Sequence, residues 1–368
     1  MIRSCYIHIP FCENICSYCD FCKMLYQKKL VDSYLDQLEK EIISIYQGEV
    51  LKTIYIGGGT PSCLSDSQLE RLFSIISILK REDDVEITIE GNIESTTIEK
   101  LLLYKKYGVN RLSFGIESTC SENLLFLERN FSKKKTEEVI ATARELGFSN
   151  INLDLMYALP GENIEMVISD LSFLLSLEVE HISTYSLMIE DHTKLGINGV
   201  KNISEDIDFT MYETISKILK ENDYDHYEIS NFCKKEYYSR HNMCYWNNEE
   251  YYGFGLGACS YIRDKRISNT RSFTDYMMGH YQKEIEIVNK RDQIEYEILL
   301  NLRKKEGISL LKFQDKYHEK FKKLYDYSNL ILVGSLKEEE DFLFIPEDKW
   351  YISNEIIVQL LGCEIDGK

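Results

Sequence analysis

Four cysteines stand close together in the stretch FCENICSYCDFC at residues 11–22. Read from Cys12 their spacing is C-x3-C-x2-C, and read from Cys16 it is C-x2-C-x2-C. In the first reading, Cys12, Cys16 and Cys19 are three thiolates on one short loop. Such a loop can hold three corners of a [4Fe–4S] cube and leave the fourth iron open for a ligand that is not protein. In the second reading, the cysteines are Cys16, Cys19 and Cys22. A bacterial ferredoxin would continue after the third of them with a fourth cysteine and a proline, and neither follows Cys22. We therefore predict the first reading, with Cys22 as a bystander.

A structural zinc site is the alternative for the same cysteines. It would need a second C-x2-C pair or a histidine pair elsewhere in the chain. The remaining candidates, Cys233, His241 and Cys244, have the wrong spacing for that. A third interpretation is that all four are merely packed thiols, but fully buried cysteines seldom cluster in this way.

A second marker is GGGTP at residues 57–61, which follows the apolar run TIYI. Glycines at the end of a strand let a ligand approach bare backbone N–H and C=O groups. The stretch is not a phosphate-binding P-loop, since no G-K-[ST] follows, and it is not the dinucleotide pattern G-x-G-x-x-G. It is either a ligand cradle or a tight strand-to-helix turn.

Strand-like and helical patterns alternate over the first 190 residues or so and must position these markers. We expect strands within 4–10, 52–60, 84–92, 110–118, 151–161 and 181–190, and helices within 30–46, 66–79, 97–108 and 135–147. Roughly six βα units indicate an α/β protein with a parallel sheet, either open and doubly wound or closed into a barrel. Functional residues in such folds follow the ends of the strands. The cysteine loop, the glycines, Glu90 and Glu117 all do so.

The residue composition and the pattern of expected elements change after residue 200. An aromatic, polar segment is followed from about Ile285 by a smaller unit. In that unit we expect a helix at 292–303, a basic helical stretch at 312–325, a β-wing at 341–353 and a closing helix at 354–362, a pattern that resembles a winged-helix module. We predict three regions, 1–235, 236–284 and 285–368.

Composition limits the classes of partner. The chain is 44% hydrophobic and 28% charged, as is usual for a globular protein. Its formal net charge of -18 argues against binding nucleic acid. No stretch approaches the ~20 apolar residues that span a bilayer, and no secretory signal opens the sequence. We therefore expect a cytoplasmic protein with reduced thiols and no transmembrane segment, at most transiently at a membrane surface.

Together the two markers resemble the radical S-adenosylmethionine (SAM) enzymes. The resemblance rests on YIHIPFCENICSYCDF followed by GGGTP, and NRLSFGIES, INLDLMYALPG, YEISNF, HNMCYW and GFGLGACS extend it over nearly the whole chain. Within that superfamily the chain is similar to the branch around oxygen-independent coproporphyrinogen III oxidase, and there to the HemW heme chaperones, which have an HNxxYW box. The resemblance implies a partial (βα)6 TIM-like barrel with a small C-terminal winged-helix-like α+β domain.

The resemblance also implies roles for individual residues. Cys12, Cys16 and Cys19 would hold the cluster, and the amino and carboxylate groups of SAM would chelate the open iron. The matching SAM-binding positions are Tyr6, Tyr18, Gly58, Gly59, Thr60 and Glu90, with Glu117, Arg129 and Asp154 matching contacts to a second SAM in the oxidase branch. His241, in the HNxxYW box, is the candidate heme ligand, because imidazole is a normal axial ligand of heme iron.

Several of these residues also have structural interpretations. Asp154 lies in the apolar run INLDLMYAL, where an unpaired carboxylate is costly, so it needs Arg129 or a ligand as partner. His241 could simply bond its neighbours. Two departures from the family pattern stand out. Glu117 occupies a position where the family usually has Gln, and Lys235-Glu236 stand where it often has Pro-Gly.

Two functions follow from the resemblance. One is a heme chaperone that binds heme, a [4Fe–4S] cluster and SAM, and delivers heme to a recipient hemoprotein, which could be membrane-bound. The other is an oxidase in which SAM is cleaved and a porphyrinogen propionate is decarboxylated. Phe21 stands where the oxidase has a cysteine, and the chain begins almost at the cluster loop. Both features favour the chaperone. Cleavage of SAM is compatible with either function.

Overall fold

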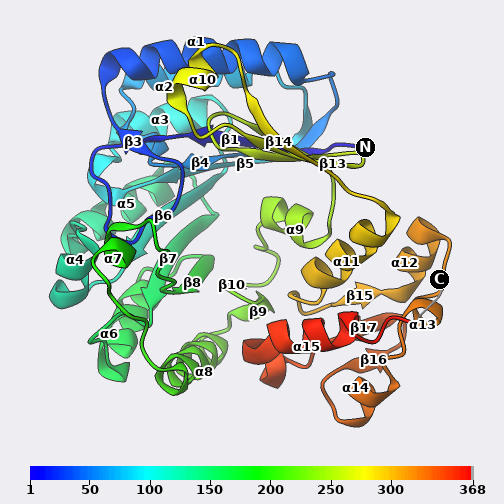
Figure 1. Cartoon of the computed structure of the whole chain (residues 1–368). Coiled ribbons are helices and arrows are strands. Elements are labelled where there is room, and N and C mark those ends of the chain that lie inside the picture. The colour runs from blue at the N-terminus through cyan, green and yellow to red at the C-terminus, as the bar shows by residue number, and fades with distance from the viewer. Residues whose placement is uncertain (366–368) are drawn as a thin grey trace.

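A curved sheet of twelve strands forms the frame of the molecule, which is described here from a computed structural model for residues 1–365. Six parallel strands lie side by side in chain order: β1 (Ser4–Ile9), β4 (Leu51–Gly58), β5 (Arg81–Gly91), β6 (Arg111–Glu117), β7 (Ile151–Tyr157) and β8 (His181–Ser186). They make a partial barrel, open on one side, as the curved arrows of Figure 1 show. The six predicted strands are thus all present, and the predicted α/β fold is confirmed.

Helices cover the outer face of this sheet (Figure 1). They are α1 (Lys28–Ile45), α2 (Asp66–Ile76), α3 (Ile98–Lys106), α4 (Ser121–Leu127), α5 (Lys133–Glu145), α6 (Ile164–Ser176) and α8 (Glu205–Glu221). Local signals set their ends. Ser65 and Gln68 form a capping box at the start of α2. Gly108 and Gly147, with φ of +85° and +81°, follow the last turns of α3 and α5, where a left-handed residue ends a helix.

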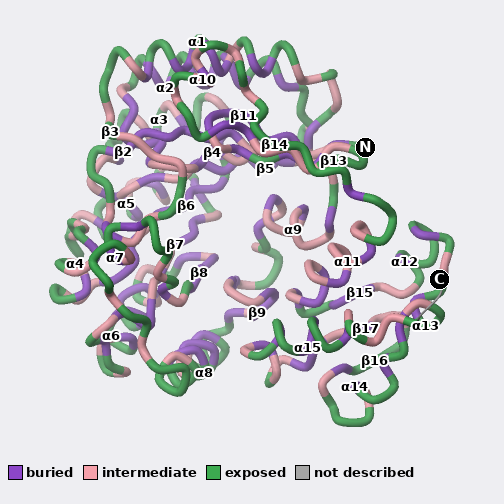
Figure 2. The backbone as a smooth tube through the Cα atoms, in the orientation of Figure 1, coloured by how far each residue is buried: buried purple, intermediate pink, exposed green. Residues whose placement is uncertain are grey.

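The alternation of side chains along the strands decides what the barrel encloses. On β6, Leu112, Phe114 and Ile116 are buried toward the helices. The positions between them, Arg111, Ser113, Gly115 and Glu117, line the barrel interior. Because successive strand residues point to opposite faces, the apolar half builds the core and the polar half builds a site. Figure 2 shows the parallel strands of the barrel largely buried and the outer turns of the helices exposed.

Further strands extend both edges of the sheet. Beside β8 lie β10 (Asn231–Cys233), antiparallel to it, and β9 (Asp225–Glu228). Beside β1 lies β11 (Tyr251–Phe254), which is parallel to β1 and is followed by the antiparallel strands β12 (Cys259–Ile262), β13 (Lys265–Asn269) and β14 (Gln282–Ile287). Part of the aromatic segment is therefore sheet, and Tyr252 and Phe254 belong to the main core.

The C-terminal unit has its own hydrophobic core, from Ile294 to Leu360. It contains α11 (Lys290–Asn301), α12 (Leu310–Tyr317), α13 (Phe321–Leu324), α14 (Ser328–Leu332) and α15 (Ser353–Leu361), with a small sheet of β15 (Ile308–Ser309), β17 (Phe342–Phe344) and β16 (Lys337–Glu339). The single basic helix expected at 312–325 is two helices, because His318 takes a left-handed φ of +60° and ends α12. The expected wing is the β16–β17 hairpin, and residues 347–352 form a 3₁₀ helix instead.

The division into 1–235, 236–284 and 285–368 stays a prediction, although the separate core beginning at Ile294 agrees with its last boundary. Within residues 1–365, no helix combines the length and the apolar character needed to cross a membrane.

Candidate functional site

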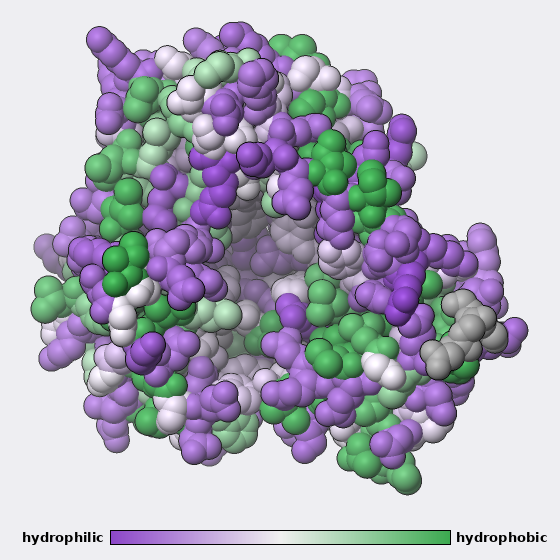
Figure 3. Space-filling view, viewed as in Figure 1, coloured by the Kyte–Doolittle hydropathy of each residue, from purple (hydrophilic) through white to green (hydrophobic). Residues whose placement is uncertain are grey.

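A cavity of about 430 Å³ opens at the carboxyl ends of the parallel strands. Figure 3 shows the molecule hollowed near the centre of this face, between the barrel and the C-terminal unit. The cavity wall includes most of the residues predicted from sequence: Cys12, Cys16, Cys19, Tyr18, Gly58, Gly59, Thr60, Glu90, Glu117, Arg129 and Asp154. Two predicted residues, Tyr6 and His241, do not line it.

The cysteine loop is fixed at both ends. Cys12 belongs to β2 (Phe11–Cys12), which pairs with β3 (Met24–Leu25) beyond the loop. In mid-loop, the Ser17 hydroxyl donates to the carbonyl of Phe126 at 2.9 Å, and the Ser17 N–H donates to that of Leu127 at 3.2 Å. The end of α4 therefore holds the loop against the barrel mouth.

The thiols of the loop have polar partners inside the cavity. The Thr60 hydroxyl lies 3.6 Å from Sγ of Cys12, and Nη1 of Arg129 lies 3.6 Å from Sγ of Cys16. Burial raises the pKa of the Cys12 thiol to about 11, although the Thr60 contact opposes the rise. Burial also raises the pKa of Cys16, against the opposing charge of Arg129. Loading with metal must therefore displace protons from these thiols.

The donor set can be tested against the two kinds of metal group. Within residues 1–365, no three Cys, His, Asp or Glu side chains converge closely enough to hold a single ion. That arrangement does not fit the zinc interpretation. Three thiolates that each bind a different iron of a cube do not have to converge on one point, so the loop fits the cluster.

Cys22 and Tyr6 line a neighbouring cavity of about 290 Å³ instead. The Tyr6 hydroxyl and Nδ1 of His8 are 2.8 Å apart, and Nε2 of His8 lies 2.7 Å from the carbonyl oxygen of Cys22. The Tyr6 ring lies beside that of Tyr55, which lines the main cavity, with centroids 6.1 Å apart. Tyr6 is thus one residue removed from the main cavity, and a direct SAM contact by it stays a prediction.

The glycines are needed for packing as well as for access. A Cβ on Gly59 would lie 2.7 Å from the carbonyl oxygen of Phe11 and 2.9 Å from Sγ of Cys12. Gly58 has a φ of +119°, which side chains rarely tolerate, and its N–H donates to Glu90 at 2.9 Å. The turn is therefore a tight one, and Gly58 and Gly59 line the cavity. That it cradles a ligand stays a prediction.

Two carboxylates of the polar wall, Glu90 and Glu117, have close hydrogen-bond or ion-pair partners. Glu90 accepts hydrogen bonds from the Tyr55 hydroxyl at 2.7 Å and from Gly58, and burial raises its pKa to about 7. Glu117 accepts one from the Tyr18 hydroxyl at 3.0 Å and pairs with Arg129 at 2.8 Å. Burial raises the pKa of Glu117 to about 7, against the opposing charge of Arg129.

The hydrogen-bond partner of Asp154 is Asn152 and not Arg129. Its Oδ1 accepts a hydrogen bond of 2.7 Å from the amide of Asn152. Arg129 pairs with Glu117, and in the described residues no ion pair joins it to Asp154. Asp154 is only half-buried and faces the cavity, so the ligand interpretation of this carboxylate stays open as a proposal.

His241 lies below the cavity floor, on the short helix α9 (Arg240–Trp246). It is 1% exposed, and both ring nitrogens have partners, with Nδ1 2.8 Å from the Thr53 hydroxyl and Nε2 2.8 Å from the Tyr245 hydroxyl. Burial, with the charge of Arg111 nearby, lowers its pKa to about 3. The imidazole is therefore neutral, and a metal could bind it only after one of these bonds is broken.

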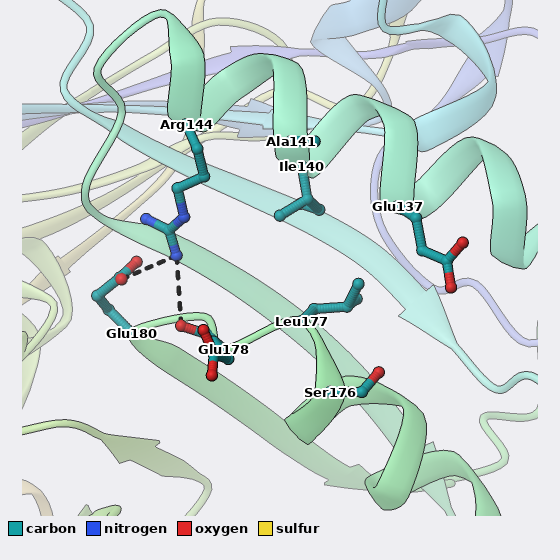
Figure 4. A pocket seen from close by; sticks show the side chains of 8 residues that line it. All are labelled: Glu137, Ile140, Ala141, Arg144, Ser176, Leu177, Glu178 and Glu180. Atoms are coloured by element: carbon teal, nitrogen blue, oxygen red, sulfur yellow. Dashed lines mark hydrogen bonds and ion pairs between the residues drawn. The ribbon is translucent and has the colours of Figure 1, made fainter.

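A third hollow, of about 740 Å³, lies on the outer surface between α5 and α6 (Figure 4). Arg144 crosses it to Glu180 at 2.8 Å and to the carbonyl oxygen of Glu178 at 3.4 Å. It contains none of the predicted site residues.

Comparison with known proteins agrees with this geometry. The Radical SAM superfamily profile matches residues 6–174. The chain is 41% identical to the heme chaperone HemW of Lactococcus lactis subsp. lactis (strain IL1403), over 99% of this chain and 98% of that protein. This chain belongs to the HemW family. HemW of Bacillus subtilis (strain 168) is 37% identical, over 98% of this chain and 100% of that protein.

A solved structure shares the fold of this chain. The radical SAM coproporphyrinogen III oxidase (HemN) of Escherichia coli superposes with a TM-score of 0.86, covering 97% of this chain and 89% of that one, at 21% identity. At that identity the likeness establishes the fold alone. For this member of the HemW family, it confirms the predicted architecture.

Some residues of this HemW-family site were not singled out from the sequence. Arg111, Tyr55, Asn92 and Asn242 all line the cavity. The alternation in RLSFGIE could have revealed Arg111, since it shares the inward phase of Glu117. Asn242 could not be found in that way, because its place depends on α9 folding back under the barrel.

Proposed function

We propose that this chain is a heme chaperone that binds a [4Fe–4S] cluster, SAM and heme, and delivers heme to a recipient hemoprotein. The observation that carries the proposal is the gathering of Cys12, Cys16 and Cys19 with the glycine turn and Glu90 around one cavity. Two full-length relatives that are named heme chaperones support the same function.

The residues divide the work of binding. The three thiolates would hold the cluster, whose open iron offers a coordination site to the amino and carboxylate groups of SAM. The backbone at Gly58 and Gly59, with the Thr60 hydroxyl, would contact the methionine end. Glu90 would accept ribose hydroxyl bonds, for which its carboxylate oxygens have spare lone pairs beside Tyr55 and Gly58.

The wall beyond Glu90 suits a second ligand. Tyr18, Glu117 and Arg129 form a connected set, and Asp154 faces the same space. Donors and acceptors held by one another keep fixed directions, so a ligand with an amine and a carboxylate could bind without reorganising them. In the proposal this is where a second SAM, or the porphyrin edge, lies.

His241 is the proposed heme ligand, and its burial implies an opening step. The N-terminus of α9 is held by Glu86, whose carboxylate accepts from the N–H of Arg240 at 3.1 Å and of His241 at 3.0 Å. Release of the Tyr245 bond would free Nε2. We propose that heme enters when α9 shifts away from the barrel floor.

The recipient is proposed to be a hemoprotein that the chain contacts in the cytoplasm. If the recipient is membrane-bound, the chain would contact it transiently at the membrane surface. The second candidate function is that of a coproporphyrinogen oxidase, because the chain shares its fold with such an enzyme.

One paired experiment separates the two functions. Cluster-loaded protein is titrated with hemin under anaerobic conditions, and the same preparation is incubated with coproporphyrinogen III, SAM and a reductant. The proposal predicts a Soret shift at about one heme per chain and no decarboxylated porphyrin. Consumption of coproporphyrinogen without heme binding would replace the chaperone with the oxidase.

A further inference from the structure

Arg111 is a buried cation that pairs directly with no carboxylate of the described residues, although Glu90 and Asp154 lie close enough to feel its charge. It opens β6, faces the barrel interior and is 2% exposed. Within residues 1–365, no carboxylate oxygen lies within the 4.0 Å of an ion pair from its guanidinium, and its Nε has no hydrogen-bond partner. Arg129, in the same cavity, differs in pairing with Glu117 and donating to the carbonyl oxygen of Gly115 at 2.7 Å.

Arg111 is almost fully buried, but it lines the cavity, where a ligand can contact it. It lines the inner end of the cavity, together with Ser113, Asn152, Ser183 and Asn242. These neighbours are amides and hydroxyls. Asn152 donates to Ser113 at 2.8 Å and to Asp154 at 2.7 Å, so its donors are already used. Within residues 1–365, no hydrogen bond joins the Arg111 guanidinium to these neighbours, and its Nε has no partner.

A charge that is buried without a partner costs free energy, and proteins retain such a charge mainly where something pairs with it. The planar guanidinium fork matches a carboxylate with two parallel hydrogen bonds. In a water-poor site this pairing is stronger than at the surface.

We propose that Arg111 is the anchor for a carboxylate of the ligand that occupies the inner end of the cavity, beyond the SAM at the cluster. The inference rests on the proposed function for the choice of ligands to test, and it adds a binding residue to that site. Two ligands bring the required chemistry, heme through its propionates and a second SAM through its amino-acid end. In the proposed function the carboxylate of the SAM at the cluster would chelate the open iron, so it would not be the partner of Arg111.

The test replaces the charge with an apolar chain of similar length, Arg111→Met, in cluster-loaded protein. Affinities are measured for hemin against hemin dimethyl ester, and for SAM against decarboxylated SAM. Whichever carboxylate Arg111 binds, that ligand should lose about 10- to 100-fold in affinity. Its counterpart without the carboxylate should bind wild type and variant alike. The pair that responds identifies the source.

Stability provides an independent readout. Removing an unpaired buried charge should leave the melting temperature of the ligand-free protein unchanged or raise it, whereas Arg129→Met should lower it by stranding Glu117. Arg144→Met, on the outer surface shown in Figure 4, is the matched control and should leave all four affinities unchanged. If Arg111→Met does not fold, Arg111→Lys keeps the charge without the fork and allows the same comparison.

The outcomes separate this inference from the proposed function. If wild type binds no hemin, the chaperone function fails, while the SAM pair still tests Arg111. Equal affinities of wild type and variant for both carboxylate ligands would overturn the inference and leave the proposed function intact. Equal losses for a ligand and its carboxylate-free counterpart would overturn it too, since the effect would then be general distortion.

Discussion

Nη1 of Arg129 lies 3.6 Å from Sγ of Cys16, so the ion pair of Arg129 with Glu117, the last residue of β6, contacts the cysteine loop. The same guanidinium pairs with Glu117 at 2.8 Å, and Tyr18 of the loop donates to the other oxygen of that carboxylate. The loop is thereby joined to β6 through two of its own residues. A positive charge beside a thiol favours the thiolate, which is the form that binds iron.

Arg129→Met should destabilise the protein by about 3 kcal/mol, because it leaves Glu117 buried without its counter-ion. In a Glu117→Gln background, where no charge is stranded, the same substitution should cost much less. Urea unfolding of the four variants measures the difference. Equal losses in the two backgrounds would mean that the pair is not coupled.

The cysteine register has a direct chemical test. Reconstituted wild type should hold about four iron and four sulfide per chain, and Cys12→Ala, Cys16→Ala and Cys19→Ala should each lose them. Cys22→Ala should keep them, because that thiol lines the neighbouring cavity. A variant set in which Cys22→Ala loses the cluster and Cys12→Ala keeps it would reverse the assignment.

Gly59→Ala should reduce cluster loading as well as SAM binding. The new methyl group would lie 2.7 Å from the backbone oxygen of Phe11 and 2.9 Å from Sγ of Cys12, so the cysteine strand must shift. Iron content per folded chain is the measurement. Gly161→Ala is the control: its φ of +88° strains any side chain, but its Cβ would meet nothing within 4 Å, so it should cost stability without lowering the iron content per folded chain. Normal iron content in Gly59→Ala would show that the turn can yield.

The stability of the protein should depend on pH through Glu41. This carboxylate accepts from the Gly255 N–H at 2.8 Å, from the Tyr276 hydroxyl at 2.7 Å and from Asn269 at 2.6 Å, which ties α1 to the β11–β13 edge. Burial raises its pKa from 4.5 to about 7. The folded chain therefore holds the proton more tightly than the unfolded chain does.

The sign follows from that proton. The contribution of Glu41 to the free energy of unfolding should fall as pH rises from about 4.5 to about 7, and be level above that range. The full change is about 3 kcal/mol. In Glu41→Gln this part of the pH dependence should vanish, so the stability difference between variant and wild type should grow with pH. A constant difference between pH 5 and pH 8 would contradict the assignment.

The sequence predicted what depends on local periodicity. Six inner strands and their helices were readable because β6 alternates Leu112, Phe114 and Ile116 with polar residues, and because Gly108 and Gly147 end helices. The cluster loop was readable because its ligands are adjacent in sequence. The site carboxylates followed from their places at strand ends.

The pairing of elements far apart in the sequence could not be predicted. β11 pairs with β1, Ser4 opposite Tyr251, and nothing local in the aromatic segment specifies that partner. The packing of the same segment could not be predicted either. Tyr252 and Phe254 pack in the core and His241 bonds Thr53 and Tyr245, because α9 folds back beneath the barrel. Contacts of this kind depend on the whole chain.

The most direct test of the central claim is a hemin titration of cluster-loaded wild type, His241→Ala and Tyr245→Phe, followed at the Soret band. Wild type should bind about one heme per chain, and His241→Ala should weaken the binding or change the spectrum without losing the cluster, which has other ligands. Tyr245→Phe removes a bond that Nε2 must give up, so it should tighten binding by up to about tenfold. Heme binding by His241→Ala with the spectrum and affinity of wild type would contradict the account.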